Sequence, residues 1–379
     1  MALCSRSGAG LAGVSSIGSL LVALAASAMH AQAPADCGGG TAENCLALGD
    51  KYRDGVDVAK DPARAAALYQ TACDAGVLAA CKQRGAAYLS GSGVPQDTAR
   101  SFALFAKACD GGYLPGCNRL GALYERQDAA RAVALYQKAC EGGDVYGCVN
   151  LGRAYWAGFG VAANTDQAAA LFQKACDSGG LPGCTNLGLV YLGGEGVGAD
   201  TARAVALFQK ACDGADLDGC NSLGIAYEAG LGVPEDAARA VALYEKACDG
   251  GVALACANLG RDYAGGRGVP KDLARAAALY QKACDGGDFW GCGKLGVAYV
   301  LGSGVPEDAT RGAAFLQKAC DGADLRGCIK LGMVYEGGLG VPQDLTQATA
   351  VYRKACDGGD ADGCTNLKRL AESGSEDAP

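Results

Sequence analysis

The chain has 379 residues, half of them apolar, and carries a formal net charge of −8. It contains no block of lysine and arginine, and an acidic chain without a basic stripe argues against binding nucleic acid or anionic membranes. One histidine, His30, is too few for a histidine-based catalytic triad or a histidine-ligated zinc site, so we expect no metal and no cofactor.

The first 31 residues have the composition of a secretory signal. They contain no acidic residue and one basic residue, Arg6, and an apolar run over 17–28 precedes a stretch of small residues. This pattern predicts a signal peptide at 1–31, cleaved after Ala28 or Ala31, and therefore a periplasmic or secreted protein. The apolar run is short for a membrane span, although an uncleaved anchor is the alternative. No other stretch approaches 18 apolar residues, so no membrane span is expected after cleavage.

A pair of cysteines eight positions apart, with a glycine-rich turn between them, recurs through the rest of the chain. The second cysteine of each pair returns every 36 residues, apart from one step of 31 residues between Cys117 and Cys148. Self-similarity at this period is typical of a stacked repeat array. The ten pairs are Cys37/Cys45, Cys73/Cys81, Cys109/Cys117, Cys140/Cys148, Cys176/Cys184, Cys212/Cys220, Cys248/Cys256, Cys284/Cys292, Cys320/Cys328 and Cys356/Cys364.

We predict that each of these pairs forms a disulfide. Cys4 lies within the predicted signal, so the exported chain keeps an even 20 cysteines, as suits an oxidising compartment. The turn reverses the chain and lets the two cysteines approach, whereas on one straight helix they would lie about 12 Å apart. Metal-binding thiolates are the alternative, but Cys-x7-Cys spacing without Cys-x2-Cys or histidine partners fits zinc poorly.

Each second cysteine begins a helical pattern of the form C-x2-L-G-x2-Y. Cys148, Leu151 and Tyr155, for example, stand at positions i, i+3 and i+7, which is one face of a helix. We call this helix A and expect it to start at the second cysteine. The glycine after the leucine, here Gly152, is unfavourable inside a helix, and its recurrence predicts a point at which a neighbouring helix approaches closely.

A glycine-rich loop leads from helix A to a second helix, helix B. The loop 91–97 ends on Asp97, whose side chain is placed to accept from free amides in the first helical turn. The same N-cap position is filled by Asp61, Asp128, Asn164, Asp200, Asp236, Asp272, Asp308 and Asp344. Helix B buries alanine, leucine and an aromatic residue and ends at a glycine. The 31-residue step deletes the loop but keeps both helices.

These patterns predict an all-α protein, an α/α solenoid (superhelix) of about nine 36-residue helix-turn-helix repeats stapled by disulfides. The solenoid should occupy 32–371 and end in a lone polar helix from Cys364 to about Ala371. Residues 372–379 are expected to form a disordered tail. We expect the protein to be a monomer.

The motifs C-x2-L-G-x2-Y, G-x-G-V-x-x-D and A-L-Y-x-K-A-C-D-G-G together resemble the Sel-one-like repeat, a relative of the tetratricopeptide repeat. The resemblance covers about residues 37–370, and the paired cysteines are similar to those of the cysteine-rich Hcp branch of secreted bacterial proteins. It implies an adaptor that binds a protein or peptide. Because Hcp-branch proteins are often labelled β-lactamases, it also implies an alternative, a weak β-lactam-binding hydrolase. The leader lacks the arginine spacing of a transit peptide, which disfavours the family's mitochondrial branch.

The sequence offers little for hydrolysis. A serine β-lactamase requires Ser-x-x-Lys, and no serine after the predicted signal has lysine three positions on. The run from Thr365 to Lys368 has the spacing with threonine in place of serine, and we interpret it as a solvated helix face. No catalytic residue is assigned, and hydrolysis stays the alternative that the resemblance implies.

A binding surface is easier to place. The positions two and five residues after the second cysteine vary while the repeat frame stays constant, and they share one side of helix A. Helix A lines the concave face of tetratricopeptide-like arrays, so the resemblance implies a groove for an extended peptide, with cell-wall-derived compounds or β-lactams as other ligands. Asparagine offers a peptide backbone both a donor and an acceptor, although such side chains can instead bond between repeats. Lysine and arginine favour an acidic peptide. The predicted contacts are Asn150, Arg153, Asn186, Ser222, Asn258, Arg261, Lys294 and Lys330.

Overall fold

The computed structural model describes residues 37, 40–194 and 196–376, and these contain nineteen α-helices and no strand. Nine hairpins of helix A and helix B are followed by one terminal helix. The helices A are α1 (Ala42–Asp54), α3 (Leu78–Ser90), α5 (Leu114–Tyr124), α7 (Val145–Ala157), α9 (Leu181–Gly193), α11 (Leu217–Ala229), α13 (Ala253–Gly265), α15 (Phe289–Leu301) and α17 (Leu325–Gly337), with α19 (Ala361–Glu376) at the end. The helices B are α2 (Pro62–Asp74), α4 (Thr98–Asp110), α6 (Ala129–Glu141), α8 (Thr165–Asp177), α10 (Thr201–Asp213), α12 (Ala237–Asp249), α14 (Leu273–Asp285), α16 (Ala309–Asp321) and α18 (Leu345–Asp357).

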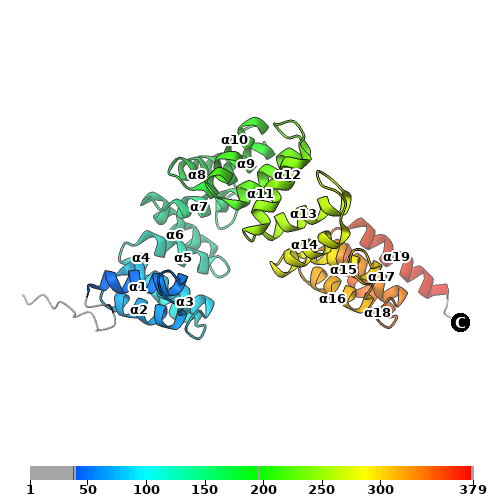
Figure 1. Cartoon of the computed structure of the whole chain (residues 1–379), viewed down its shortest axis with the longest axis horizontal. Helices are drawn as coiled ribbons and strands as arrows, with labels where there is room; N and C mark the ends of the chain where they lie inside the picture. Colours follow the sequence, from blue (N-terminus) through cyan, green and yellow to red (C-terminus); the bar gives the residue numbers. More distant parts are fainter. Residues whose placement is uncertain (1–36, 38–39, 195, 377–379) are drawn as a thin grey trace, which may run out of the picture.

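The hairpins stack into a curved array. Each helix packs against the helices before and after it in the chain. Successive helices A also contact one another along most of the array, as α5 does α7, whereas successive helices B contact one another at most weakly. An array that is close-packed on its A side and splayed on its B side must curve toward the A side. Figure 1 shows the result, an open arch running from α1 to α19. The predicted all-α solenoid is confirmed.

Every helix B begins at the predicted cap. Asp97 Oδ1 accepts from the backbone N–H of Arg100 at 2.9 Å, which satisfies one of the free amides of the first turn of α4. The same bond is made by Asp61, Asp128, Asn164, Asp200, Asp236, Asp272, Asp308 and Asp344. Because Asp128 caps α6 as the others cap theirs, the short connection after α5 changes no part of the helical frame.

The recurring glycine of helix A is the point at which helix B approaches, as predicted. A Cβ added to Gly152 would lie 2.6 Å from the ring of Phe172, and one added to Gly188 would lie 2.5 Å from the ring of Phe208. Both rings are fully buried. Aromatic rings cover the equivalent glycines in most other hairpins: Tyr69 on Gly49, Phe105 on Gly85, Tyr136 on Gly121, Tyr244 on Gly224, Tyr280 on Gly260 and Tyr352 on Gly332. Only a residue without a side chain allows this close approach.

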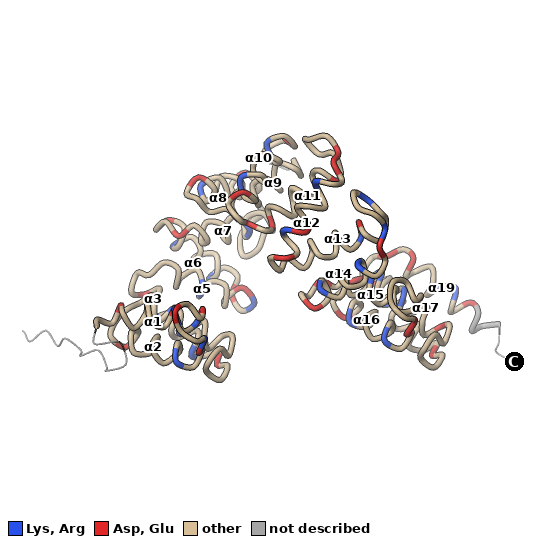
Figure 2. Tube along the Cα trace, in the orientation of Figure 1, with Lys and Arg blue, Asp and Glu red and all other residues tan. Residues whose placement is uncertain are grey.

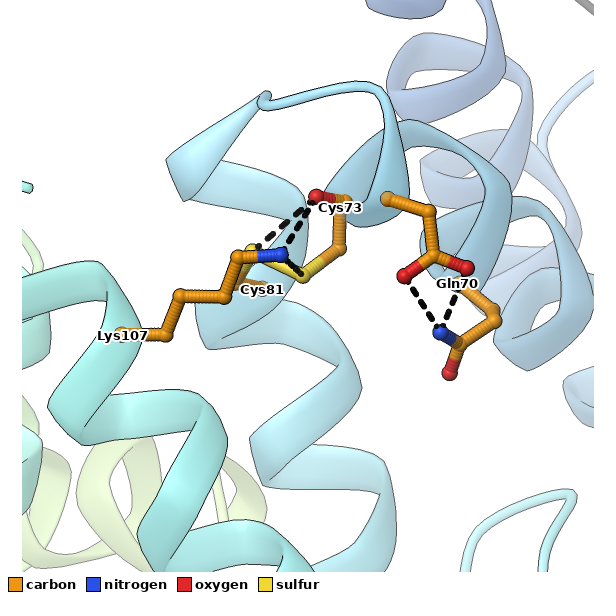
Figure 3. The surroundings of a disulfide bond; sticks show 5 residues. Gln70, Cys73, Cys81 and Lys107 are labelled. Carbon is orange, nitrogen blue, oxygen red and sulfur yellow. Dashed lines mark hydrogen bonds between the residues drawn. A yellow bond between two sulfur atoms is a disulfide. The ribbon is translucent and has the colours of Figure 1, made fainter. Parts of the chain in front are cut away.

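All ten predicted disulfides are present. With Cα–Cα distances from 4.4 to 4.9 Å, they are Cys37–Cys45, Cys73–Cys81, Cys109–Cys117, Cys140–Cys148, Cys176–Cys184, Cys212–Cys220, Cys248–Cys256, Cys284–Cys292, Cys320–Cys328 and Cys356–Cys364. All except the first join the end of a helix B to the first turn of the next helix, as Cys73–Cys81 does in Figure 3. The disulfides therefore staple neighbouring helices.

A lysine of the following helix B reinforces most of these junctions. Lys107 donates from Nζ to the carbonyl of Cys73 at 3.0 Å. Lys138, Lys174, Lys210, Lys246 and Lys318 make the equivalent bond. A cation suits the carbonyl end of a helix, so these lysines link successive repeats where the disulfides link successive helices.

The bridged cysteines lie in the interior of the stack rather than on its inner face. All are buried apart from Cys356 and Cys364 of the last pair, which are half-buried. The second cysteines of the other pairs are mostly at most 1% exposed: Cys45, Cys81, Cys117, Cys184, Cys220, Cys256, Cys292 and Cys328. Their role is therefore structural, and a ligand on the surface cannot touch them.

The predicted start of helix A is wrong by three residues in every repeat. The helix α7, for example, begins at Val145 rather than at Cys148, because the turn between the helices is short. The second cysteine accordingly lies inside the first turn of its helix and does not open it. The same correction applies at Cys45, Cys81, Cys117, Cys184, Cys220, Cys256, Cys292, Cys328 and Cys364.

The predicted end of the terminal helix is also wrong. The helix α19 continues to Glu376, past the predicted end near Ala371, and so takes up part of the expected tail at 372–379. No proline occurs there to stop it, and a single glycine costs a helix only about 1 kcal/mol.

The predicted signal peptide, 1–31, lies outside the described residues, as do Cys4 and residues 377–379. Among the helices that are described, none is long and apolar enough to span a membrane.

Candidate ligand-binding groove

The eight predicted contacts lie on six successive helices A, from α7 to α17. Each lies on the helix A side of the array, along which most successive helices A contact one another. Lysine and arginine alternate with aspartate and glutamate along the whole chain trace in Figure 2, so no single sign of charge dominates the arch. Parts of this face therefore differ mainly in whether their lysine and arginine side chains form ion pairs with carboxylates of the protein.

Two of the predicted asparagines connect adjacent repeats. Asn150 Nδ2 on α7 donates to Asn118 Oδ1 on α5 at 2.7 Å, and Asn258 on α13 donates to Asn221 on α11 at 3.1 Å. Asn258 is only 7% exposed, which leaves a ligand little of it to touch. Bonding between repeats was the alternative for these residues. An amide group has a second N–H, and only the half-buried Asn150 presents it near the surface.

Asn186 and Ser222 lie between these two positions. Asn186 Nδ2 donates to the carbonyl of Pro182, one turn earlier in its own helix α9, at 2.6 Å. Ser222 on α11 is half-buried, and its hydroxyl makes no hydrogen bond to any part of the chain that the structure describes. The four polar residues Asn150, Asn186, Ser222 and Asn258 therefore occupy equivalent positions in successive repeats, but they do not form one continuous chain of hydrogen bonds.

The four predicted cations differ in their surroundings. Arg153 on α7 is exposed and forms no ion pair within 37, 40–194 and 196–376. Lys294 and Lys330 are also exposed, and Lys294 Nζ lies 5.0 Å from the centre of the Trp290 ring, a cation–π contact. Arg261 is different because it is half-buried and already paired with carboxylates.

Arg261 belongs to an ion-pair cluster between α11 and α13 that the sequence reasoning missed. Its guanidinium contacts Glu228, and its Nε lies 3.7 Å from Asp262. Arg267 reaches the same two carboxylates, at 3.0 Å from Glu228 and 3.2 Å from Asp262. Asp262 is only 1% exposed. Burial, followed by the negative charge of Glu228, raises the pKa of Asp262 to about 6. The sequence did carry a signal, because the equivalent residue is apolar in every other repeat except the first, which has Lys51: Ala87, Leu123, Ala154, Val190, Ala226, Ala298 and Val334.

A hollow of about 710 Å³ lies between α3, α5 and α7, beside the turns that precede α5 and α7. Of the eight predicted contacts, all of which are described, only Asn150 lines it. Arg119 occupies the repeat position of Asn150 one repeat earlier and belongs to the same variable series, although it was not among the eight predicted contacts. Among the other lining residues, Gly142 and Gly143 belong to the recurring glycine-rich turn, and the rest were not singled out by the sequence. In full, the other lining residues are Lys82, Tyr113, Leu114, Pro115, Asn118, Gly142, Gly143, Asp144, Val145 and Tyr146.

A second hollow, of about 660 Å³, lies over the loop that precedes α14. Arg275 on its wall stacks on Tyr263, 4.5 Å from the ring centre, and pairs with Glu245 at 3.4 Å. Asp272 on the same wall caps α14. Because these groups already hold the helices together, this hollow offers a ligand fewer polar partners than the one at α3, α5 and α7.

The metal-ligating residue types and the Thr-x-x-Lys run are the remaining features that bear on chemistry. Within the described residues, no three His, Cys, Asp or Glu side chains are grouped as metal ligands would be. The Thr365 hydroxyl donates to the carbonyl of Ala361 at 2.9 Å, and Lys368 lies 3.7 Å from Glu372. Both side chains of the Thr-x-x-Lys run therefore have local partners on α19.

The repeat frame is that of a known family. The family model of the Sel1 repeat, the Sel-one-like repeat named above, matches 45–77, 78–113, 115–144, 145–180, 181–216, 217–252, 253–288, 291–324 and 325–360. The chain belongs to the Sel1 repeat family. Its nine matched repeats agree with the nine helical hairpins, and proteins of this family are generally non-enzymatic scaffolds.

Several solved structures resemble this Sel1 repeat protein. A protective antigen of uropathogenic Escherichia coli with an SLR fold is 27% identical, over 88% of this chain and 73% of that one, with a TM-score of 0.59. A Sel1 repeat protein from Oxalobacter formigenes is 24% identical, over 80% of this chain and 90% of that one, with a TM-score of 0.56. The cysteine-rich protein B of Helicobacter pylori is 30% identical, over 35% of this chain and 94% of that one, with a TM-score of 0.29. No curated protein matches the chain.

Proposed function

We propose that this Sel1 repeat protein is an exported scaffold that binds a protein or peptide along the inner face formed by its helices A. The observation that carries the proposal is the presence of exposed cations without an ion-pair partner among the described residues of that face, such as Arg153. Many cations of helix B are instead used by the frame, because lysines bond helix ends and arginines stack on tyrosines, as Arg239 does on Tyr227 at 4.4 Å.

The expected ligand is an acidic peptide. Unpaired cations on a concave surface attract carboxylates and speed their association. A peptide backbone can use the remaining N–H of a half-buried amide such as Asn150. Because the chain as a whole carries a net charge of −8, an acidic ligand should be drawn to this face rather than to the surface in general.

Export is supported by the composition of 1–31 and by the ten disulfides, which persist in oxidising compartments. The test is to express the full chain in a bacterial host and separate periplasm and medium from cytoplasm. The exported protein should gain about 20 Da on complete reduction, one hydrogen for each cysteine. Accumulation of the full-length chain in the cytoplasm, with free thiols, would contradict the proposal.

Binding is tested with a matched pair of charge-neutralising variants. Partners captured from periplasmic extract should bind Arg153→Gln, on the inner helix α7, at least about fivefold more weakly than wild type, equivalent to about 1 kcal/mol. Arg353→Gln removes the same charge from an exposed position on helix B α18 and should bind normally. If Arg353→Gln reduces binding and Arg153→Gln does not, the ligand lies on the outer face.

The alternative from the resemblance, a β-lactam hydrolase, has no residue arrangement among the described residues in its favour. Nitrocefin is the appropriate substrate for a direct test on purified protein. The scaffold proposal expects no turnover above the uncatalysed rate, and turnover that co-purifies with the folded protein would overturn it.

A further inference from the structure

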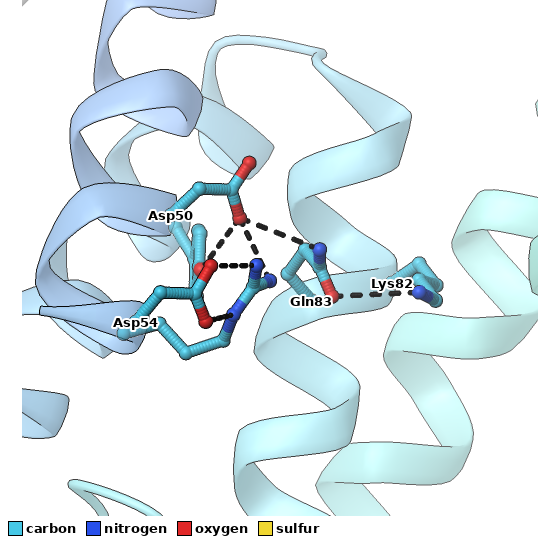
Figure 4. A network of polar contacts seen from close by, with 6 residues as sticks. Asp50, Asp54, Lys82 and Gln83 are labelled. Carbon is cyan, nitrogen blue, oxygen red and sulfur yellow. Dashed lines mark hydrogen bonds and ion pairs between the residues drawn. The ribbon is translucent and has the colours of Figure 1, made fainter. Parts of the chain in front are cut away.

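Lys82, on the wall of the hollow between α3, α5 and α7, is held in place by a polar network that starts on α1 (Figure 4). Asp50 accepts from the hydroxyl of Tyr69 and from Arg53 Nη1, each at 2.8 Å. The Gln83 amide lies 3.5 Å from Asp50, and its oxygen faces Lys82 Nζ at 3.4 Å. The network therefore orients the ammonium group without pairing it with a carboxylate.

Arg119 supplies a second cation on the same wall. It is exposed on α5 and makes no ion pair or hydrogen bond to any described residue. Burial, followed by the positive charge of Arg119, lowers the pKa of Lys82. Asp144 is the one carboxylate among the lining residues, and its Oδ1 already accepts from the N–H of Gly147 at 2.6 Å. Two cations against one carboxylate leave the hollow with a net charge of +1.

Other residues that line the hollow are apolar or aromatic. Tyr146 is 60% exposed, and Tyr113, Pro115 and Val145 line the space beside it. Leu114 closes the wall: a Cβ added to Gly142 in the adjoining turn would lie 2.3 Å from its methyl group. An exposed aromatic ring next to two unneutralised cations suits a ligand that is both anionic and apolar.

Asn118 and Asn150 line the hollow as well. Asn118 is 8% exposed, and its amide oxygen is occupied by the 2.7 Å bond from Asn150. This bond leaves the N–H groups of Asn118 and the second N–H of Asn150 unused, and such donors favour an anion.

We propose that this hollow binds a carboxylate of a peptide together with the apolar side chain next to it. The carboxylate faces Lys82 and Arg119, and the apolar side chain packs on Tyr146. A carboxylate at a peptide C-terminus and one on an aspartate or glutamate side chain have the same chemistry, so both sources qualify. This inference rests on the proposed scaffold function and narrows it to one site and one ligand class.

The probe is a fluorescein-labelled peptide, Gly-Ser-Gly-Ala-Glu-Leu, with a free C-terminus, measured by fluorescence anisotropy on the full oxidised protein. Its C-terminal amide, its glutamine-for-glutamate version and the doubly neutral peptide complete the set. We expect the doubly neutral peptide to bind at least about tenfold more weakly than the parent, because it leaves both cations unpaired. Whichever single neutralisation causes the loss identifies the source of the carboxylate. Equal binding of all four peptides would overturn the inference.

Matched variants locate the site. Lys82→Gln with Arg119→Gln should weaken binding of the parent peptide at least about tenfold. Lys271→Gln with Arg353→Gln removes the same charge from two exposed positions that neither line the hollow nor belong to the predicted contacts, and it should leave binding within about twofold. Tyr146→Ala should weaken the parent peptide more than a version ending in glycine, which a purely electrostatic site would not do.

The contrary outcomes separate the two proposals. If Lys294→Gln with Lys330→Gln on the inner face weakens binding and Lys82→Gln with Arg119→Gln does not, the hollow is wrong while the inner-face scaffold stands. If no peptide binds below about 1 mM, the hollow is also wrong, and the scaffold is then judged by the capture experiment with Arg153→Gln. Circular dichroism and the mass change on reduction confirm that each variant is folded and fully bridged.

Discussion

The region from α3 to α7 and the region from α11 to α13 are built on the same repeat but treat their inner-face charges in opposite ways. In the first, Lys82 and Arg119 line an open hollow without a carboxylate partner. In the second, Arg261 and Arg267 are locked onto Glu228 and Asp262. A few substitutions at variable repeat positions thus decide whether the cations of one region are unpaired, and so available to a ligand, or are paired with carboxylates of the protein.

The difference arises from single positions. Asp262 stands where most other helices A have an apolar residue, usually alanine or valine, and it brings a buried negative charge that its arginine partners offset. At the start of helix A, Tyr146 in the first region is replaced by Leu254 in α13. The frame tolerates both arrangements because its own contacts, the glycine–aromatic packing and the disulfides, do not involve these residues.

The largest expected effect tests whether the frame is the same in both regions. Gly121→Val on α5 and Gly260→Val on α13 would place a Cβ 2.7 and 2.8 Å from the rings of Tyr136 and Tyr280. Each should lower the free energy of unfolding by about 3 kcal/mol, measured by urea denaturation.

The control for these variants is Gly193→Val, at the end of α9, where an added Cβ meets nothing within 4 Å. It should cost less than about 1 kcal/mol. Markedly unequal losses for Gly121→Val and Gly260→Val would show that the two regions differ in their frame as well as in their charges.

The frame was predictable from sequence because it repeats. Gly152, the cap Asp97 and the pair Cys140/Cys148 recur at fixed spacing, and each has one physical explanation that depends on near neighbours in the chain. The hollow was not predictable in this way. Lys82 and Tyr146 approach across three helices A and two turns, and no periodic signal joins them.

The predicted ligand contacts remain a prediction. The sequence places them on helix A, but it does not say which of these side chains are already bonded within the fold. Asn258 turns inward toward Asn221, and Arg261 is taken up by Glu228. Their partners lie about one repeat away in sequence, at separations of 37 and 33 residues, and pairing at that distance is a property of the stacked fold.

The next largest effect concerns the region from α11 to α13, in which the cations are paired with carboxylates. Asp262 has a folded-state pKa raised to about 6, above its ordinary value near 3.9. Its ionisation therefore opposes folding at neutral pH, and this penalty disappears as the pH falls through 6 toward 4. Asp262→Ala, which restores the usual residue of the repeat, should raise the free energy of unfolding at pH 7 by about 2 kcal/mol and by much less at pH 4.5.

The quantity to measure is the difference between variant and wild type in urea at the two pH values. Taking this difference removes the contributions of all carboxylates that both proteins share. Glu235→Ala, an exposed carboxylate on the loop before α12, should show no such difference. If Asp262→Ala is destabilising at pH 7, the ion pairs of Asp262 with Arg261 and Arg267 contribute more than the burial of its charge costs. The ion-pair cluster would then stabilise the region from α11 to α13.

The smallest effect lies in the turns that join helix B to the next helix A. In the first region the turns use Gly112 and Gly143, with φ of +90° and +97°, whereas the turn before α11 places Ala215 at φ +71°. A left-handed conformation costs an alanine roughly 1–2 kcal/mol. Replacing alanine by glycine removes this cost, but the greater conformational freedom of glycine in the unfolded chain offsets part of the stabilisation. Ala215→Gly should therefore stabilise the protein by about 0.5 kcal/mol, and Gly143→Ala should destabilise it by about 1 kcal/mol. An added Cβ at Gly143 meets nothing within 4 Å, so a loss there reports backbone conformation alone. If Ala215→Gly proves destabilising in urea, this turn differs from its glycine-containing counterparts in more than the residue at its left-handed position.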